Sequence, residues 1–341
     1  MRRPSPRVGV LALVVLLVVV GVGAYGTRAF RAQRAQVASA APVAQSDLTE
    51  VEAGAHVVFR STAPGAEYGH VAMVALDDPA GPRAFTSVAC DRVDAVPTAR
   101  SCLRTVRGIA TRFEAQLLDA DWQPVQTWPL PGIPSRTRLS SDGSMLATTS
   151  FVTGHDYASI GFSTQTVVHH ADGTTSGNLE DFALTVDGNP FTNADRNIWG
   201  VTFVDDTTFY ATAASASAGT TWLVRGSLAD RTLVALRENV ECPSLSPDGT
   251  RIAFKKDVST GATPYWSIGV LDLASGTEVV VGEQRDVDDQ IEWLDDRTLL
   301  YGMAREGDGE IGVSDVWSVA AQADAQPTLF IPQAWSPAVV R

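Results

Sequence analysis

Short runs of alternating apolar and polar residues dominate the chain from about residue 55 onward. The stretch PSLSPDGTRIAFKK at 243–256 places Ile252 and Phe254 on one face of a strand, which is the period-2 pattern of half-buried β-structure. In the turn before it, Pro247 presets φ, Asp248 suits the third position, and Gly249 tolerates positive φ at the exit. The stretch therefore predicts a tight β-hairpin.

This hairpin pattern occurs four times, as RLSSDGSMLATTS (138–150), VTFVDDTTFYATA (201–213), PSLSPDGTRIAFK (243–255) and IEWLDDRTLLYGM (291–303). The turn aspartates, Asp142, Asp205, Asp248 and Asp295, are 63, 43 and 47 residues apart. Third strands are expected at 221–228, 265–273 and 314–321, and fourth strands at 232–237, 277–282 and 328–332. A period in the forties with four strands per unit is typical of β-propeller blades. Trp222, Trp266 and Trp317 are expected to pack between the blades.

Two further blades are expected nearer the N-terminus. Strands at 56–63, 69–78 and 83–89 form one blade that lacks its innermost strand, and the segment 102–130 forms another. The C-terminal stretch QAWSPAVV (333–340) matches only the opening strand of the repeat. We therefore predict an all-β, six-bladed propeller of four-stranded antiparallel blades over residues 55–341, closed by the C-terminal strand, which leaves no open sheet edge within the ring.

The N-terminus differs from this body. A basic segment (1–7) precedes an uncharged apolar run from Val8 to Gly26, about 28 Å long as a helix. The run predicts a retained membrane anchor; the alternative is a signal peptide cleaved near Ala24. Arginines flank the run on both sides, so their distribution does not decide its orientation. Residues 27–54 are rich in Ala, Arg and Pro and predict a stalk, whose first turns extend the helix.

Charge narrows the choice of partner. The first 46 residues hold six arginines and no acid, so the remainder carries 20 basic and 39 acidic residues, a net charge of −19. A body this acidic is poorly suited to bind phosphate backbones, so no nucleic-acid partner is expected. Only two lysines occur, Lys255 and Lys256, against 24 arginines. Together with the abundance of Ala, Val and Gly, this composition suggests a high-GC bacterial origin.

Cys90 and Cys102 lie twelve residues apart, and Cys242 stands alone. In an exported domain the close pair predicts a disulfide worth on the order of 3 kcal/mol; the alternative is two unrelated buried thiols. Cys242 is expected to be an inert core thiol. No spacing typical of a zinc site occurs among the cysteines and histidines.

The repeat from Ser246 to Phe254 resembles the Pro-Asp-Gly propeller repeat of TolB and its relatives. The segment from Cys90 to Leu103 is similar to one in exported TolB-like proteins of high-GC Gram-positive bacteria. The resemblance covers roughly residues 55–341 and implies a six-bladed propeller used for protein contacts outside the cytoplasm. TolB has a small α/β domain before its propeller, whereas this chain has a helix and a stalk there, so TolB's translocation role is not carried over.

Candidate catalytic and metal-binding residues are few. No HExxH or GxSxG pattern occurs, and the histidines His56, His70, His155, His169 and His170 are expected on the surface or in packing. The acidic loops 187–195 and 306–310 offer closely spaced oxygen ligands for calcium but are expected to be solvated turns. The DVDD stretch (286–289) lies where the channel of a propeller opens and is a candidate part of a binding face, although a charged loop without a ligand is the preferred reading. A group of arginines is expected to pair with the surplus acids rather than to form a basic patch: Arg92, Arg100, Arg104, Arg107 and Arg112.

These observations predict a non-enzymatic, membrane-tethered, monomeric propeller outside the cytoplasm that binds a protein or cell-envelope component. No catalytic residue, metal site or cofactor is expected. The alternatives are a propeller enzyme, such as a metal-dependent lyase or a lactonase-type hydrolase, and a sensor that binds a small ligand at the channel mouth.

Overall fold

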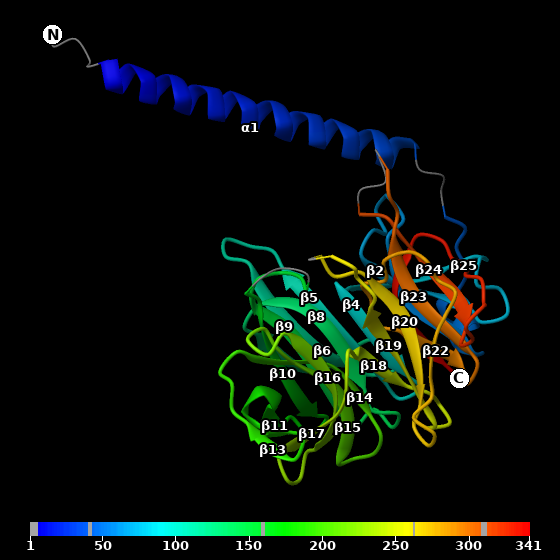
Figure 1. Cartoon of the computed structure of the whole chain (residues 1–341). Helices are drawn as coiled ribbons and strands as arrows, with labels where there is room; N and C mark the ends of the chain where they lie inside the picture. The colour runs from blue at the N-terminus through cyan, green and yellow to red at the C-terminus, as the bar shows by residue number, and fades with distance from the viewer. Residues whose placement is uncertain (1–5, 40–42, 158–160, 262, 308–311) are drawn as a thin grey trace.

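Six sheets stand around a common axis and form a six-bladed β-propeller, as the computed structural model shows (Figure 1). The structure describes residues 6–39, 43–157, 161–261, 263–307 and 312–341. Five sheets have four strands and one has six, and neighbouring strands within each four-stranded sheet are antiparallel. The predicted fold class is therefore confirmed.

The blades are numbered here in chain order, with each innermost strand first. Blade 1 holds β26 (Ala334–Val340), β1 (His56–Ser61), β2 (His70–Ala75) and β3 (Ala84–Ala89); blade 2 holds β4 (Arg92–Val96), β5 (Ala99–Val106), β6 (Arg112–Leu118) and β7 (Pro124–Leu130). Blade 3 holds β8 (Ile133–Leu139), β9 (Met145–Thr153), β10 (Ser163–His170) and β11 (Thr175–Asn178). Blade 4 holds β14 (Arg196–Phe203), β15 (Thr208–Ser215), β16 (Thr220–Ser227) and β17 (Thr232–Glu238), followed by β12 (Ala183–Val186) and β13 (Asn189–Phe191). Blade 5 holds β18 (Glu241–Leu245), β19 (Arg251–Asp257), β20 (Trp266–Asp272) and β21 (Glu278–Val280); blade 6 holds β22 (Glu292–Asp295), β23 (Thr298–Ala304), β24 (Ser314–Ala320) and β25 (Thr328–Ile331).

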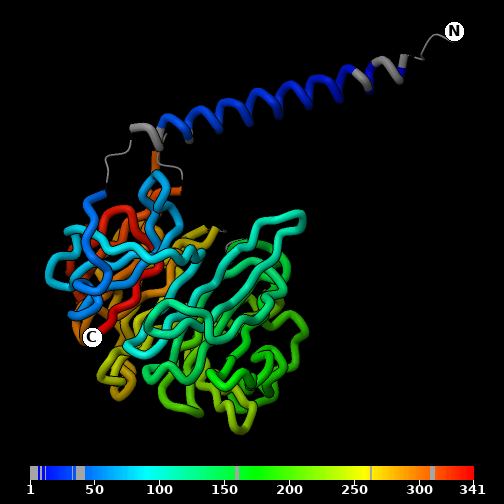
Figure 2. Tube along the Cα trace, turned by 180° about the vertical axis from the view of Figure 1, so that it is seen from behind, coloured from blue at the N-terminus to red at the C-terminus, as the bar shows by residue number. Residues whose placement is uncertain are grey.

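The C-terminal strand closes the ring. β26 pairs antiparallel with β1, with His56 opposite Val340 and Val58 opposite Ala338. Figures 1 and 2 show the first strands after the N-terminal helix beside the red C-terminal strand. Ala338 and Val58 are fully buried in the core that blade 1 shares with blade 2. The predicted closure by residues 333–340 is confirmed.

The recurring turn has one geometry in its two Asp-Gly copies. Asp248 Oδ1 accepts hydrogen bonds from Ser246 Oγ (2.6 Å) and from the backbone N–H of Thr250 (3.0 Å), and Gly249 has a φ of 70°. Asp142 Oδ1 accepts the equivalent bonds from residues 140 and 144 at 2.6 and 3.0 Å. The aspartate thus holds the tight turn at the same point of blades 3 and 5, between the innermost strand and its neighbour.

Blade 4 carries an insertion that explains the 63-residue spacing. After β11, a 3₁₀ turn, η1 (Leu179–Asp181), leads into the β12–β13 hairpin before the chain enters β14. β12 pairs in parallel with β17, the outer strand of blade 4, with Leu184 opposite Leu233. The loop 187–195, considered above for calcium, is therefore in part a hairpin, and Pro190 in β13 limits further pairing along this outer edge.

Apolar side chains fill the wedges between blades. One cluster joins blades 3 and 4 around Val168, Phe209 and Trp222, and another joins blades 5 and 6 around Ile268 and Tyr301. The three tryptophans expected between the blades lie there: Trp222 and Trp266 are buried, and Trp317 is partly buried.

The segment before the propeller contains two helices. α1 (Pro6–Ser39) extends away from the blades (Figure 1), and its stretch Leu13–Ala32, with a mean hydropathy of 2.0, is long and apolar enough to cross a membrane. This stretch begins and ends about six residues later than the predicted run from Val8 to Gly26. α2 (Leu48–Glu52) buries Val51 against the blades, and Glu52 accepts a hydrogen bond from Trp122 Nε1 at 2.8 Å. The end of the segment expected to be a stalk therefore packs on blades 1 and 2.

The predicted disulfide is present. Cys90, between β3 and β4, is bonded to Cys102 on β5, with a Cα–Cα distance of 5.4 Å. The bond therefore links the end of blade 1 to blade 2. Cys242 is a free thiol and is fully buried in the core, as expected.

Candidate functional site

Ion pairs from different blades meet on the axis of the ring. Arg92 of β4 contacts Asp289 Oδ1 at 2.7 Å, and the other oxygen of Asp289 accepts the backbone N–H of Gly302 at 2.9 Å. The guanidinium of Arg92 also lies over the ring of Trp335, 4.8 Å from its centroid. This single contact set joins blades 1, 2 and 6.

Arg138 of β8 forms a second set. Its Nη1 contacts Glu292 of β22 and lies 3.9 Å from Asp94 of β4, while its Nη2 donates to the carbonyl of Ile291 at 3.1 Å. Asp94 also accepts the backbone N–H of Leu139 at 2.6 Å. Blades 2, 3 and 6 are held together by this set.

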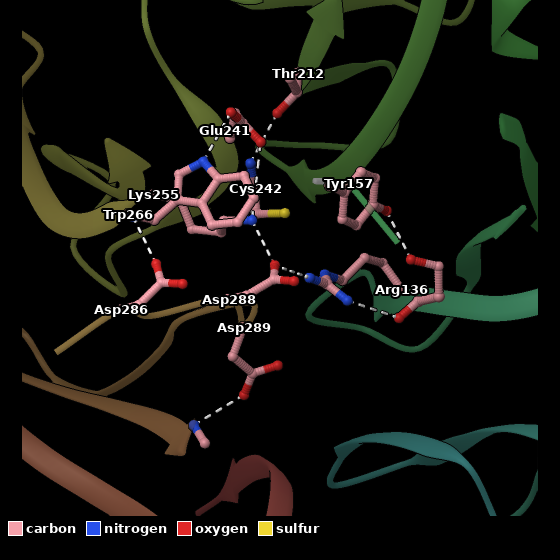
Figure 3. Close-up of polar contacts among 12 residues, drawn as sticks. Arg136, Tyr157, Thr212, Glu241, Cys242, Lys255, Trp266, Asp286, Asp288 and Asp289 are labelled. Carbon is pink, nitrogen blue, oxygen red and sulfur yellow. Dashed lines mark hydrogen bonds and ion pairs between the residues drawn. The ribbon is translucent and has the colours of Figure 1, made fainter. Parts of the chain in front are cut away.

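Lys255 lies at the centre of a third set (Figure 3). Its ammonium is fully buried, 2.5 Å from Asp288 and 3.8 Å from Glu241, and sits 3.7 Å from the centroid of the Trp266 ring. The indole N–H of Trp266 donates to Glu241 at 3.0 Å. Burial opposes the charged ammonium, but the two carboxylates outweigh it, so the pKa of Lys255 lies above its ordinary value.

Arg136 of β8 approaches the same carboxylate from the other side. Its Nη2 lies 3.3 Å from Asp288, and its guanidinium lies 5.0 Å from the ring of Tyr157, whose hydroxyl bonds with Ser135 at 2.6 Å (Figure 3). Partial burial opposes ionisation of Asp288, but the charges of Lys255 and Arg136 outweigh it and hold the pKa of Asp288 at about 2. Asp288 is therefore a carboxylate at every physiological pH.

These contacts nearly fill the axis. Four cations, Arg92, Arg136, Arg138 and Lys255, face five carboxylates, Asp94, Glu241, Asp288, Asp289 and Glu292. One cavity, lined by Arg92, Asp94, Arg136, Arg138 and Asp289 among others, has a volume of about 20 Å³. Within the described part of the chain, no three or more Cys, His, Asp or Glu side chains are grouped so that they could hold a metal ion.

A much larger groove of about 900 Å³ lies beside this plugged axis. Blade 3 contributes Tyr157 and residues 161–163, blade 4 the start of β14 and the β15–β16 turn, and blade 5 the start of β18 with Ser259 and Pro264. All of these segments lie at the same end of the blades, because they precede innermost strands or join the second strand to the third. Glu241 and Trp266 line both the groove and the third ion-pair set.

Aromatic side chains form the inner wall of the groove. Tyr157 stacks on Trp199 with ring centroids 4.8 Å apart, and Phe162 meets Trp199 edge-on at 5.7 Å. Trp199 is 1% exposed, whereas Phe162 is partly exposed. The rim is polar and includes Asp195 and Asp257.

The DVDD stretch is the sequence candidate that the structure brings to the centre. Asp288 and Asp289 join the axial ion pairs, and Asp286 accepts the backbone N–H of Trp266 at 2.7 Å. The arginine group is divided: Arg92 is axial, Arg104 pairs with Glu114 at 3.5 Å, and Arg100 donates to backbone carbonyls. The pairing expected for these residues thus holds for two of them, while Arg107 and Arg112 are exposed on the β5–β6 hairpin.

The other candidates lie apart from the axis. His169 is buried in blade 3 with Trp128 stacked on it, and its neighbour on the other face of β10, His170, bonds with Ser176. His56 is buried in β1. Part of the acidic loop 306–310, residues 308–310, lies outside the described residues.

Sequence reasoning did not assign Lys255, Arg136, Arg138 or the aromatic wall to a site. A signal was available for Lys255, because it directly follows the apolar run Ile252–Phe254 of β19 and continues its buried stretch. The others come from separate blades, and only closure of the ring brings them together.

Neither the family models nor the curated proteins include a match to this chain. Among solved structures, it is similar to TolB from Acinetobacter baumannii, with a TM-score of 0.57 and 14% sequence identity over 85% of this chain and 68% of that one. At this identity the likeness shows the propeller fold alone.

Weaker matches include an oligogalacturonate lyase in complex with manganese (TM-score 0.44, 10% identity, 77% of this chain and 72% of that one). Another is the β-propeller domain of the Trilobed protease from Pyrococcus furiosus (TM-score 0.39, 10% identity, 69% and 70%). The matched structures thus come from proteins of several different classes.

Proposed function

We propose that this chain is a non-enzymatic, monomeric β-propeller, held at the membrane by α1, whose groove-bearing end binds a protein or cell-envelope partner outside the cytoplasm. The observation that carries the proposal is the contrast between the axis and the groove. The cavity lined by Arg92, Arg136 and Arg138 on the axis has a volume of about 20 Å³, whereas the groove beside it has a volume of about 900 Å³. A groove of that size with an aromatic wall and a polar rim has the character of a binding site.

The axial charges favour a structural role over a catalytic one. The carboxylates there are engaged by arginine, lysine or backbone N–H groups. The charges of Lys255 and Arg136 hold the pKa of Asp288 at about 2, whereas burial raises the pKa values of Asp94, Glu241 and Glu292. The structural role is therefore supported by the pairing of these carboxylates with cations of other blades rather than by their protonation state.

Two further features support a location outside the cytoplasm. The Cys90–Cys102 disulfide is typical of proteins that mature in an oxidising compartment. The stretch Leu13–Ala32 has the length and composition of a membrane-spanning helix. Together they support a propeller that is tethered on the far side of the membrane from the ribosome.

The test is capture of partners from native membranes with the full-length chain in detergent. The control bait is a variant in which an arginine replaces Ala216, which lines the groove in the β15–β16 turn, so that the added side chain obstructs it. We expect at least one envelope component to be retained by the native bait and lost from the obstructed one. Retention of the same components by both baits would remove the support for the groove as the binding site.

The groove also supports a second candidate, a sensor of a small ligand. A thermal-shift screen of the full-length chain against glycans and short peptides separates the two, because a sensor gains stability from a small molecule alone. The enzyme alternative predicts a tightly bound metal, which metal analysis of the purified chain would detect.

A further inference from the structure

The groove between blades 3, 4 and 5 has a chemistry that selects its ligand. Two carboxylates, Asp195 and Asp257, lie on its rim, from blades 4 and 5 respectively. Asp195 accepts the backbone N–H of Ser217 at 2.6 Å and the hydroxyl of Ser215 at 2.9 Å, and these bonds lower the pKa of Asp195 below its ordinary value. Asp257 accepts the backbone N–H of Ser259 at 2.8 Å. Both carboxylates are therefore positioned by short local hydrogen bonds.

Among the described residues that line the groove, Arg196 is the one cation, and it already donates hydrogen bonds within the chain. Its Nε donates to the carbonyl of Glu180 at 2.8 Å, and its Nη1 lies 3.5 Å from the carbonyl of Asn193. The body around the groove has a net charge of −19, so the local and the long-range fields both favour a cationic ligand.

The wall of the groove carries a donor that lacks an acceptor. The indole N–H of Trp199 is buried and has no hydrogen-bond partner among the described residues. An unsatisfied buried donor is unfavourable, and a ligand with an acceptor oxygen that reaches this N–H would remove that cost. A bare cation has no such oxygen, whereas a peptide backbone has a carbonyl at every residue.

Aromatic rings in this region already bind positive charge within the chain. Lys255 lies over Trp266, and Arg136 lies over Tyr157. Phe162, which packs edge-on against both Tyr157 and Trp199, is partly exposed in the groove and offers a further ring to a guanidinium or an ammonium.

We propose that the groove binds an exposed basic segment of a partner protein, with an arginine or lysine side chain between Asp195 and Asp257 and a backbone carbonyl accepting from Trp199. This inference rests on the proposed function and narrows the partner to one that presents a cationic peptide. The cationic side chain of the ligand would contact the carboxylates of the rim, and its backbone carbonyl would contact the aromatic wall.

The experiment measures peptide binding to the full-length chain in detergent. The probes are a Gly/Ser peptide that carries three arginines and the same peptide with citrulline at those positions, which has a similar shape and no charge. Binding is followed by calorimetry and by tryptophan fluorescence, because Trp199 and Trp266 line the groove. We expect the arginine peptide to bind at least about tenfold more tightly.

Four variants are compared with the native chain. Asp195→Asn and Asp257→Asn each keep an acceptor oxygen and remove one charge. Each is expected to lower the affinity for the arginine peptide about fivefold. Asp230→Asn is the matched control: it removes the same charge from an exposed aspartate that also bonds a serine, beyond the far end of β16. It is expected to leave binding unchanged. Trp199→Phe keeps an aromatic ring but removes the indole N–H donor, and it is expected to lower the affinity for both peptides.

Equal affinity for the two peptides would overturn the proposal. It would also be overturned if Asp195→Asn and Asp257→Asn bound the arginine peptide as tightly as Asp230→Asn does. Unchanged binding by Trp199→Phe would overturn the carbonyl contact. Thermal unfolding of each variant shows whether it is folded. If membranes yield a partner whose retention survives both rim substitutions, the groove assignment fails and the proposed function stands. If the arginine peptide binds as expected but no partner is found, the proposed function fails instead.

Discussion

The axial pair Arg92–Asp289 allows a quantitative test of what holds the ring together. The side chain of Asp289 is 1% exposed and that of Arg92 is 14% exposed. Replacing Asp289 with Asn preserves volume and an acceptor for Gly302, but it turns an amide toward a guanidinium that then lacks its counter-charge. The substitution therefore isolates the charge from the packing.

Loss of one partner from a buried ion pair costs about 3–5 kcal/mol, because the remaining charge stays buried without compensation. For a domain of this size we expect Asp289→Asn to lower Tm by roughly 5–10 °C. Replacement of both partners by apolar residues, Arg92→Met with Asp289→Leu, is expected to cost less than the sum of the two single changes, because no charge is then left unpaired.

The assay is thermal unfolding of the full-length chain in detergent, followed by circular dichroism. Arg104→Gln provides the control, since the Arg104–Glu114 pair spans 3.5 Å with side chains that are 38% and 23% exposed. That substitution is expected to lower the free energy of unfolding by less than about 1 kcal/mol, and this loss is expected to be smaller still at high salt. Equal losses from Asp289→Asn and Arg104→Gln would refute the reasoning, and so would strict additivity in the double variant.

Three further predictions concern stability and are checked by the same unfolding assay. Burial lowers the pKa of His169 from 6.5 to about 4, so the unfolded chain binds the extra proton, and the contribution of His169 to stability falls by up to about 3 kcal/mol as pH drops from about 6.5 to 4. Burial raises the pKa of Glu180 to about 7 and gives it the opposite slope, so the prediction is checked as the difference in stability between the native chain and His169→Gln at each pH. Replacing Cys90 and Cys102 together with Ser is expected to cost about 2–4 kcal/mol, and a reducing agent would then change the native chain but not the variant. Gly302→Ala is expected to cost about 1–3 kcal/mol, because its Cβ would lie 2.4 Å from the ring of Trp335; an unchanged Tm would contradict that crowding.

Most of the fold could be predicted because four of the six blades carry the same local hairpin signal. Tight turns such as the one at Asp248 and the period-2 strands beside them are short-range features, and an opening strand at the C-terminus required a partner near residue 56. The β12–β13 hairpin was missed although its turn at Asp187–Gly188 is a local hairpin signal, because its strands are only four and three residues long. Its parallel pairing with β17 joins residues about fifty positions apart and has no local pattern.

The candidate site was only partly predictable for a related reason. The DVDD stretch was recognised from its position before an innermost strand, but its cationic partners lie in blades 2, 3 and 5, and their spacing along the sequence is irregular. The groove depends on the connections of three blades, and the unsatisfied indole of Trp199 depends on packing that no periodicity encodes.

Pairing of β26 with β1 has a consequence for biosynthesis. Because residue 56 must wait for residue 340, blades 2 to 6 and three strands of blade 1 leave the ribosome before blade 1 can be completed. Until then β1 presents a bare apolar edge to its surroundings. The nascent chain therefore needs to be kept apart from its neighbours, by translocation or by a chaperone, until its last strand is available.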